Sequence, residues 1–215
     1  SAATGATTSD NSVYIGYQAG GTATLTGNQN TIIGALSGDA ITSGATNTVV
    51  GPYAFKGNTT GSNNIAVGSD SLRYPDTEDH NLAIGFQALG GSGLAGGEYN
   101  VAIGNNSFDA VTSADNGIAI GYNAGGGVTT GNGNICIGNE TGVTGTVLTT
   151  GYINILHGMS TRTSAADSAY QFVIGYDIAG GEDSQITIGK ASNVIQNEFD
   201  TDNAYDNSSN YRFTV

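Results

Sequence analysis

Short apolar triplets, each closed by a glycine, recur from residue 13 to residue 189. Residues 64–68 read Asn-Ile-Ala-Val-Gly, residues 81–85 read Asn-Leu-Ala-Ile-Gly, and close variants appear before and after them. The closing glycine falls at Gly16, Gly34, Gly51, Gly68, Gly85, Gly104, Gly121, Gly138, Gly158, Gly175 and Gly189. Successive steps are 18, 17, 17, 17, 19, 17, 17, 20, 17 and 14 residues. A period this regular indicates a repeat architecture in which each copy is one structural unit.

The first and third positions of each triplet are mostly β-branched. The third positions include Ile15, Ile33, Val50, Val67, Ile84, Ile103, Ile120 and Ile137, and the first include Val13, Thr31, Thr48, Ile65, Leu82, Val101, Ile118 and Ile135. Residues two apart lie on one face of a strand. We therefore predict short strands whose Ile/Val columns form a continuous buried stack.

The middle position of the triplet is small in the central copies. Ala66, Ala83, Ala102 and Ala119 occupy it, followed by Cys136. This column should face away from the Ile/Val columns, on a side where a solvated strand would carry polar residues. One interpretation is that a symmetric partner chain packs on these alanines. The other is that alanine fills a tight corner inside a single coil.

The remaining columns predict turns. Asparagine introduces most copies and glycine is abundant, at 35 of 215 residues; both residue types tolerate the positive φ that tight turns need. Asparagines in register could also form amide ladders along the stack. We predict an all-β, parallel β-solenoid (β-roll) with about 17 residues per coil. Residues 1–10 would be a lead-in, 11–189 the solenoid, looser after residue 143, and 190–215 a cap or transition segment.

Charge and composition exclude several functions. The formal net charge is −13, from 18 acidic and 5 basic residues, so no basic stripe is present to bind nucleic acid. No apolar run approaches the roughly 20 residues needed to cross a bilayer, and membrane insertion is not expected. The lone Cys136 excludes an intramolecular disulfide.

Catalytic, cofactor and metal signals are weak, and we predict none of these sites. His80 and His157 lie in different copies, and His157 is best explained as a hydrogen-bonded histidine at an irregular coil. The group Asp76, Glu78 and Asp79 is typical of a solvated loop. The strongest metal alternative is a cation near Asp200, Asp202 and Asp206, but the EF-hand glycine and glutamate are missing. Repeated threonines such as Thr59 and Thr60 form no unbroken ice-binding array.

The variable connectors are where recognition is expected, because loops on a rigid scaffold commonly carry binding residues. The connectors span residues 56–63, 73–80, 90–99 and 109–115. Their candidate receptor-contact residues are Lys56, Arg73, Tyr74 and Tyr99.

Several copies resemble repeats of known fibrous proteins. Asn11-Ser-Val-Tyr-Ile-Gly16 and Asn116-Gly-Ile-Ala-Ile-Gly121 resemble the repeat of trimeric autotransporter adhesin heads. Asn81-Leu-Ala-Ile-Gly-Phe-Gln-Ala-Leu89 is similar to repeats of bacteriophage tail fibres, which often precede a self-cleaving intramolecular chaperone. Residues 197–205 resemble the stretch just before that chaperone.

The resemblance implies a homotrimer of left-handed coils on a virion tail fibre or extracellular surface, binding a cell-surface glycan or protein receptor without enzymatic activity. The repeat is longer here than in adhesin heads, so the coil cross-section should differ. The chaperone is absent, so its autoproteolysis cannot be assigned to any residue. The alternatives are the head of a bacterial trimeric adhesin and a glycan-cleaving tailspike.

Overall fold

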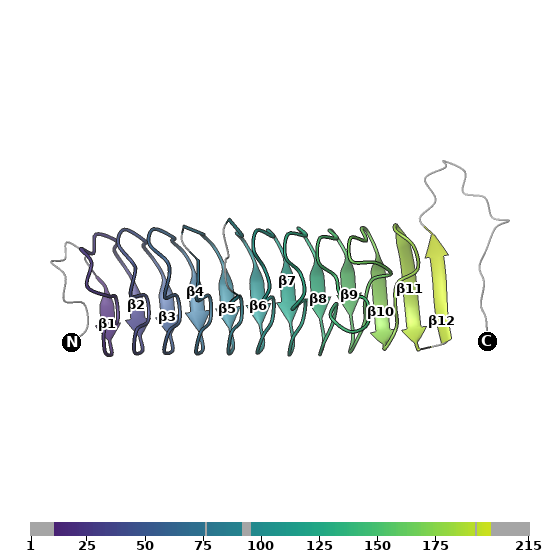
Figure 1. The fold of residues 1–215 in the computed structure, drawn as a ribbon, viewed down its shortest axis with the longest axis horizontal. Coiled ribbons are helices and arrows are strands. Elements are labelled where there is room, and N and C mark those ends of the chain that lie inside the picture. Colours follow the sequence, from purple (N-terminus) through teal and green to yellow (C-terminus); the bar gives the residue numbers. More distant parts are fainter. Residues whose placement is uncertain (1–10, 76, 92–95, 192, 199–215) are drawn as a thin grey trace.

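The computed structural model describes residues 11–75, 77–91, 96–191 and 193–198 as an elongated stack of strands (Figure 1). One sheet of twelve strands runs in sequence order from β1 to β12. No helix occurs within these four ranges. The strands are β1 (Val13–Ile15), β2 (Thr31–Ile33), β3 (Thr48–Val50), β4 (Ile65–Val67), β5 (Leu82–Ile84), β6 (Val101–Ile103), β7 (Ile118–Ile120), β8 (Ile135–Ile137), β9 (Ile155–His157), β10 (Phe172–Tyr176), β11 (Gln185–Lys190) and β12 (Asn193–Glu198).

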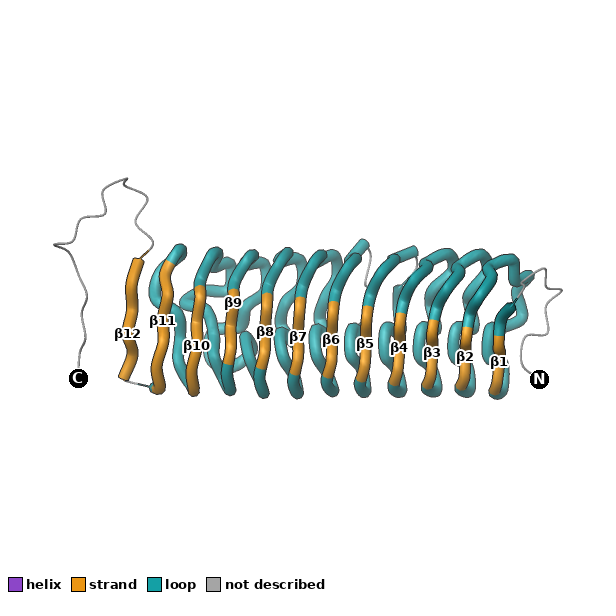
Figure 2. The backbone as a smooth tube through the Cα atoms, turned by 180° about the vertical axis from the view of Figure 1, so that it is seen from behind, coloured by secondary structure: helices purple, strands orange, loops and turns teal. Residues whose placement is uncertain are grey.

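Each repeat is one coil of a parallel β-solenoid. Every neighbouring pair from β1 to β11 is parallel and in register, so that Thr31 pairs with Thr48 and Thr48 with Ile65. The connectors complete each coil and return the chain to the next strand (Figure 2). The sequence prediction of a parallel β-solenoid with coils of about 17 residues is confirmed.

The orientation of the strands corrects the sequence analysis. The middle residue of the triplet points into the coil: Ala66, Ala83, Ala102 and Ala119 are all 0% exposed within a single chain. The prediction that a partner chain packs on these alanines is therefore wrong, and the second interpretation, a tight interior, holds. The flanking Ile/Val columns, predicted to be buried, point outward and are partly or largely exposed.

The size of the buried residues explains this orientation. The coil interior is narrow, and the middle strand residue shares it with the residue four positions after the closing glycine. In three coils a small alanine is combined with a large second residue: Ala66 with Leu72, Ala83 with Leu89, and Ala102 with Phe108. In the first two coils the large residue is the middle strand residue, Tyr14 or Ile32, and a glycine stands four positions after the closing glycine. A Cβ added at Gly20 would lie 2.5 Å from the Tyr14 ring, and one at Gly38 would lie 2.8 Å from Ile32 Cδ1. Side chains of complementary size thus fill the interior of these coils. In the coil of β3 the pair is bulkier, since Val49 and Phe55 are both fully buried.

A buried asparagine ladder joins the coils at the start of the strands. The Asn47 side-chain oxygen accepts a hydrogen bond from the Asn64 backbone N–H at 2.9 Å, and Asn64 does the same for Asn81 at 2.9 Å. The side-chain amide of Asn64 donates to the Glu78 carbonyl at 2.8 Å. The amide ladder suggested by the sequence is thus present. It supplies hydrogen-bond partners to backbone groups that the short strands do not pair.

The solenoid ends by a reversal of strand direction. β11 pairs in parallel with β10, whereas β12 pairs with β11 in the antiparallel sense, with Ile188 opposite Ile195. The change in architecture therefore lies between Lys190 and Asn193. The predicted lead-in (1–10) and the possible cation residues Asp200, Asp202 and Asp206 lie outside the described residues.

Candidate assembly and receptor-binding surfaces

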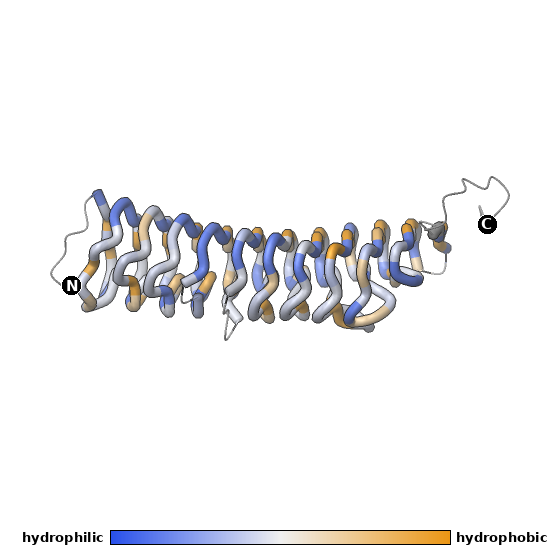
Figure 3. The backbone as a smooth tube through the Cα atoms, turned by 90° about the horizontal axis from the view of Figure 1, so that it is seen from above, coloured by the Kyte–Doolittle hydropathy of each residue, from blue (hydrophilic) through white to orange (hydrophobic). Residues whose placement is uncertain are grey.

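The outer face of the sheet from β1 to β11 carries two exposed columns of apolar side chains, here called the outer columns. They are the first and third triplet residues, and only Thr31, Thr48 and His157 among them are not apolar. Ile15 in β1 is 56% exposed and Ile65 in β4 is 41% exposed. Val101 and Ile103, in the middle strand β6, are half-buried. Figure 3 shows hydrophobic segments recurring at each coil along the stack. With strands about 4.8 Å apart, the stripe is about 50 Å long.

His157 is the one titratable residue of the outer columns. It ends β9 and pairs in register with Ile137 on one side and Ile174 on the other. Its side chain is exposed. The histidine therefore lies on the outward, apolar face of the sheet, at the position that isoleucine or valine occupies in the other coils.

Three of the four predicted receptor-contact residues come together on the connectors after β3 and β4. The Arg73 guanidinium carbon lies 4.9 Å from the centre of the Tyr74 ring and 5.6 Å from that of Tyr53. The Lys56 ammonium lies 5.6 Å from the Tyr53 ring. We call Tyr53, Lys56, Arg73 and Tyr74 the cation–tyrosine cluster. Sequence reasoning missed Tyr53. The repeat does show that Lys56 and Arg73 are neighbours, because each stands five residues after a closing glycine on adjacent coils.

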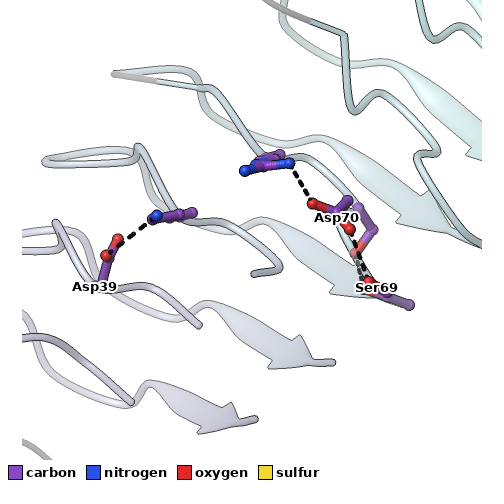
Figure 4. Close-up of polar contacts among 7 residues, drawn as sticks. Asp39, Ser69 and Asp70 are labelled. Atoms are coloured by element: carbon purple, nitrogen blue, oxygen red, sulfur yellow. Dashed lines mark hydrogen bonds and ion pairs between the residues drawn. The ribbon is translucent and has the colours of Figure 1, made fainter. Parts of the chain in front are cut away.

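Two carboxylates hold the cations of this cluster (Figure 4). Arg73 Nη1 donates to Asp70 Oδ1 at 2.6 Å, and the Ser69 hydroxyl donates to Asp70 Oδ2 at 2.7 Å. The Lys56 ammonium lies at a longer distance, 4.0 Å, from Asp39 Oδ2. Partial burial raises the pKa of Asp39 above its usual value, and the nearby Lys56 charge opposes that shift. The arginine is thus firmly oriented, whereas the lysine is held loosely.

Tyr99, the fourth predicted contact residue, lies apart from the cluster. Its ring stacks on His80, with centroids 4.9 Å apart and planes 13° from parallel. The two residues immediately precede the ladder asparagines of adjacent coils. They therefore occupy equivalent positions at another corner of the solenoid.

Glu78 and Asp79 of the 73–80 connector bind backbone N–H groups and do not form a solvated loop, which corrects the sequence interpretation for these two residues. Glu78 is 2% exposed and accepts hydrogen bonds from the Thr77 backbone N–H at 2.9 Å and the Gly96 backbone N–H at 2.6 Å. Asp79 accepts a bond from the backbone N–H of Ser62. Carboxylates fill these positions because stacked connectors present backbone donors that need acceptors. Asp76 lies outside the described residues.

Other reactive groups are dispersed or buried. Across the described part of the chain, no group of three or more His, Cys, Asp or Glu side chains could hold a metal ion. Cys136 is fully buried, and burial raises the pKa of its thiol to about 12. Because the thiolate is the reactive form, this cysteine behaves as a small core residue.

Comparison of the chain with protein-family models, with curated proteins and with solved structures finds no match. None of the described residues belongs to a helix long and apolar enough to cross a membrane.

Proposed function

We propose that this chain is a non-enzymatic structural and host-attachment segment of a phage-like, homotrimeric tail fibre, in which the outer columns of three copies face one another. The observation that carries the proposal is the uncovered apolar face of a parallel sheet. Parallel sheets are normally covered on both faces. A long, contiguous exposed apolar stripe is typical of a surface that meets a partner.

A second copy of the same chain is the best-matched occupant. Identical parallel coils have the same spacing, so an Ile/Val side chain on one copy meets an Ile/Val side chain on the next along the full stack. A threefold axis along the stack brings three such stripes together in a closed assembly. The connectors, including the cation–tyrosine cluster, do not belong to the sheet, and they supply varied side chains for a cell-surface receptor.

Solution mass tests the assembly. We expect wild-type protein to sediment with three times the 21.6 kDa mass of one chain. Ile120→Glu, in the middle of an outer column, should prevent assembly because three like charges would be buried together. Ser113→Glu adds the same charge on an exposed connector and should leave the trimer intact. Wild-type protein that is monomeric at micromolar concentration would contradict the proposal.

Attachment is tested separately. Fluorescently labelled trimer should bind to the surface of a susceptible bacterial strain and not to strains that lack the receptor. Release of sugars from purified capsule or lipopolysaccharide, abolished by a single carboxylate substitution, would instead support the glycan-cleaving tailspike.

A further inference from the structure

The cation–tyrosine cluster combines two kinds of group that recognise different parts of one ligand. Tyr53 and Tyr74 are 39% and 42% exposed, so each offers aromatic surface to the outside. Lys56 and Arg73 bring positive charge to within 6 Å of those rings. Aromatic rings provide large apolar contact area at a low entropic cost, and cations provide directional binding of anions.

The location of these cations is unusual for this protein. The whole chain has 5 basic residues against 18 acidic ones. Lys56 and Arg73 nevertheless stand at equivalent positions of adjacent coils, where strand spacing puts their backbones about 5 Å apart. Each cation has a carboxylate partner, Lys56 with Asp39 and Arg73 with Asp70. Both cations also lie 5.6 Å from the centre of the Tyr53 ring, so an anion bound over this ring would be attracted by both.

The two cations differ in how freely they can bind such an anion. Arg73 is fixed by Asp70 and by the adjacent tyrosine rings, so it forms a rigid wall of the site. Lys56 is 34% exposed and lies 4.0 Å from its carboxylate partner, which is the limit of an ion pair. Its ammonium can therefore turn toward a ligand at little cost.

We propose that the cation–tyrosine cluster is a binding site for an acidic saccharide. The apolar C–H face of a sugar ring would pack on Tyr53 or Tyr74, and its carboxylate or phosphate would lie between Lys56 and Arg73. This inference rests on the proposed attachment function and names the class of receptor. The negative charge of the surface elsewhere repels acidic saccharides and so favours binding where cations lie on tyrosine rings. Lys190, 5.9 Å from the centre of the Tyr176 ring, is another such pair, but it has one tyrosine instead of two.

Binding should be measured on three sets of immobilised oligosaccharides: uronate-bearing, phosphate-bearing, and their neutral parents with the same linkages. We expect wild-type protein to bind one acidic set at least 10-fold more tightly than its neutral parent, and binding to weaken as salt is raised. The set that binds identifies the acidic group, carboxylate or phosphate, that the cluster recognises. Competition of that binding by purified capsule or by purified lipopolysaccharide then identifies the source.

Three variants assign the site. Lys56→Gln removes the loosely held charge and leaves the Arg73–Asp70 pair intact, and Tyr74→Ala removes aromatic surface without changing charge. Each should weaken binding of the acidic probe about 10-fold or more, with solution mass and circular dichroism unchanged. Arg162→Gln is the matched control, because Arg162 also pairs with an aspartate, Asp177, at 3.0 Å and lies outside the cluster. It should bind as wild type does.

The outcomes separate the two proposals. If no acidic probe binds better than its neutral parent, or if Lys56→Gln and Tyr74→Ala bind as wild type does, the saccharide site is wrong. Retained attachment to whole cells in that case leaves the attachment function standing. If the intact wild-type trimer does not attach to whole cells at all, the proposed attachment function itself is contradicted.

Discussion

Asparagine is buried at two kinds of position in this protein, the ladder column and the single position of Asn58, with opposite consequences for the residue. In the ladder, Asn64 is fully buried and both ends of its side-chain amide are paired. Asn58 is equally buried, yet neither its Nδ2 nor its Oδ1 has a hydrogen-bond partner. It stands seven residues after a closing glycine, where other coils have the buried apolar residues Ile41, Val111 and Val128. The same side chain is thus stabilising in the ladder and costly at the position of Asn58.

Asn58→Val should stabilise the protein. It replaces an unpaired buried amide by an apolar group of similar size, and we expect the free energy of unfolding to rise by about 1–3 kcal/mol. Urea unfolding at a fixed protein concentration measures this. Val128→Asn makes the reverse change at the equivalent position and should destabilise by a similar amount. Equal stability of Asn58→Val and wild type would show that Asn58 is satisfied in solution.

Asp109 should make stability depend on pH. Partial burial raises its pKa above the usual aspartate value, although its own backbone amide opposes the shift. A carboxyl with a raised pKa in the folded state binds protons more tightly there, so stability falls as pH rises from the usual value through the raised one.

Asp109→Asn removes this penalty. At pH 7 the variant should be more stable than wild type by roughly 0.2–1 kcal/mol, because the group is only partly buried and water screens the effect. At pH 3, where the carboxyl is protonated in both states, the difference should vanish. Urea titrations at both pH values check this, and a difference that is independent of pH would point to a cause other than ionisation.

At the scale of the strand and its turn, the closing glycine is what allows coils to stack. Gly104 has φ +132°, and a Cβ added there would lie 2.3 Å from the carbonyl oxygen of Gly121 in the next coil. Gly68 and Gly121 have the same φ and nearly the same close approach, at 2.4 and 2.5 Å. The repeat keeps glycine because both the dihedral angle and the distance between coils require it.

Gly104→Ala should therefore destabilise the protein by about 3 kcal/mol or more, the combined cost of backbone strain and overpacking. Gly96→Ala is the control, because Gly96 also has a positive φ, +104°, but an added Cβ would meet nothing within 4 Å. That variant should show strain alone, about 1–3 kcal/mol. Equal losses in thermal or urea unfolding would mean that the contact between coils contributes little.

At the scale of the whole molecule, negative charge works against compactness. The chain carries a net charge of −13, and a trimer would bring three such chains together. Screening of this repulsion should raise the melting temperature as sodium chloride increases from roughly 0.01 M to roughly 0.1 M, since the screening length falls from about 30 Å to about 10 Å.

A matched variant isolates the role of charge in this response. Asp167→Asn combined with Glu182→Gln removes two exposed negative charges, so its melting temperature should rise less with salt. Melting followed by circular dichroism at each salt concentration provides the measurement. A melting temperature that falls with salt would indicate that ion pairs such as Arg73–Asp70 outweigh the repulsion.

The sequence by itself determined the repeat, the strand positions and the asparagine ladder. A period near 17 with β-branched triplets and closing glycines has few physical solutions other than stacked coils. It also pointed to Lys56, Arg73 and Tyr74. It could not reveal that Tyr53 joins them while Tyr99 does not, because those distances depend on the path of each connector.

Only the tertiary structure decided which face of the strands is inside. Alternation with a period of two marks two faces without saying which is buried, and larger apolar residues usually lie inside. Here the narrow coil interior holds the small Ala102 together with the large Phe108. Val101 and Ile103, on either side of Ala102, point outward. The limited volume inside the narrow coil therefore puts the small middle residue inside and the Ile/Val columns outside, the reverse of the predicted orientation. This volume depends on the path of the whole coil and cannot be read from any single residue.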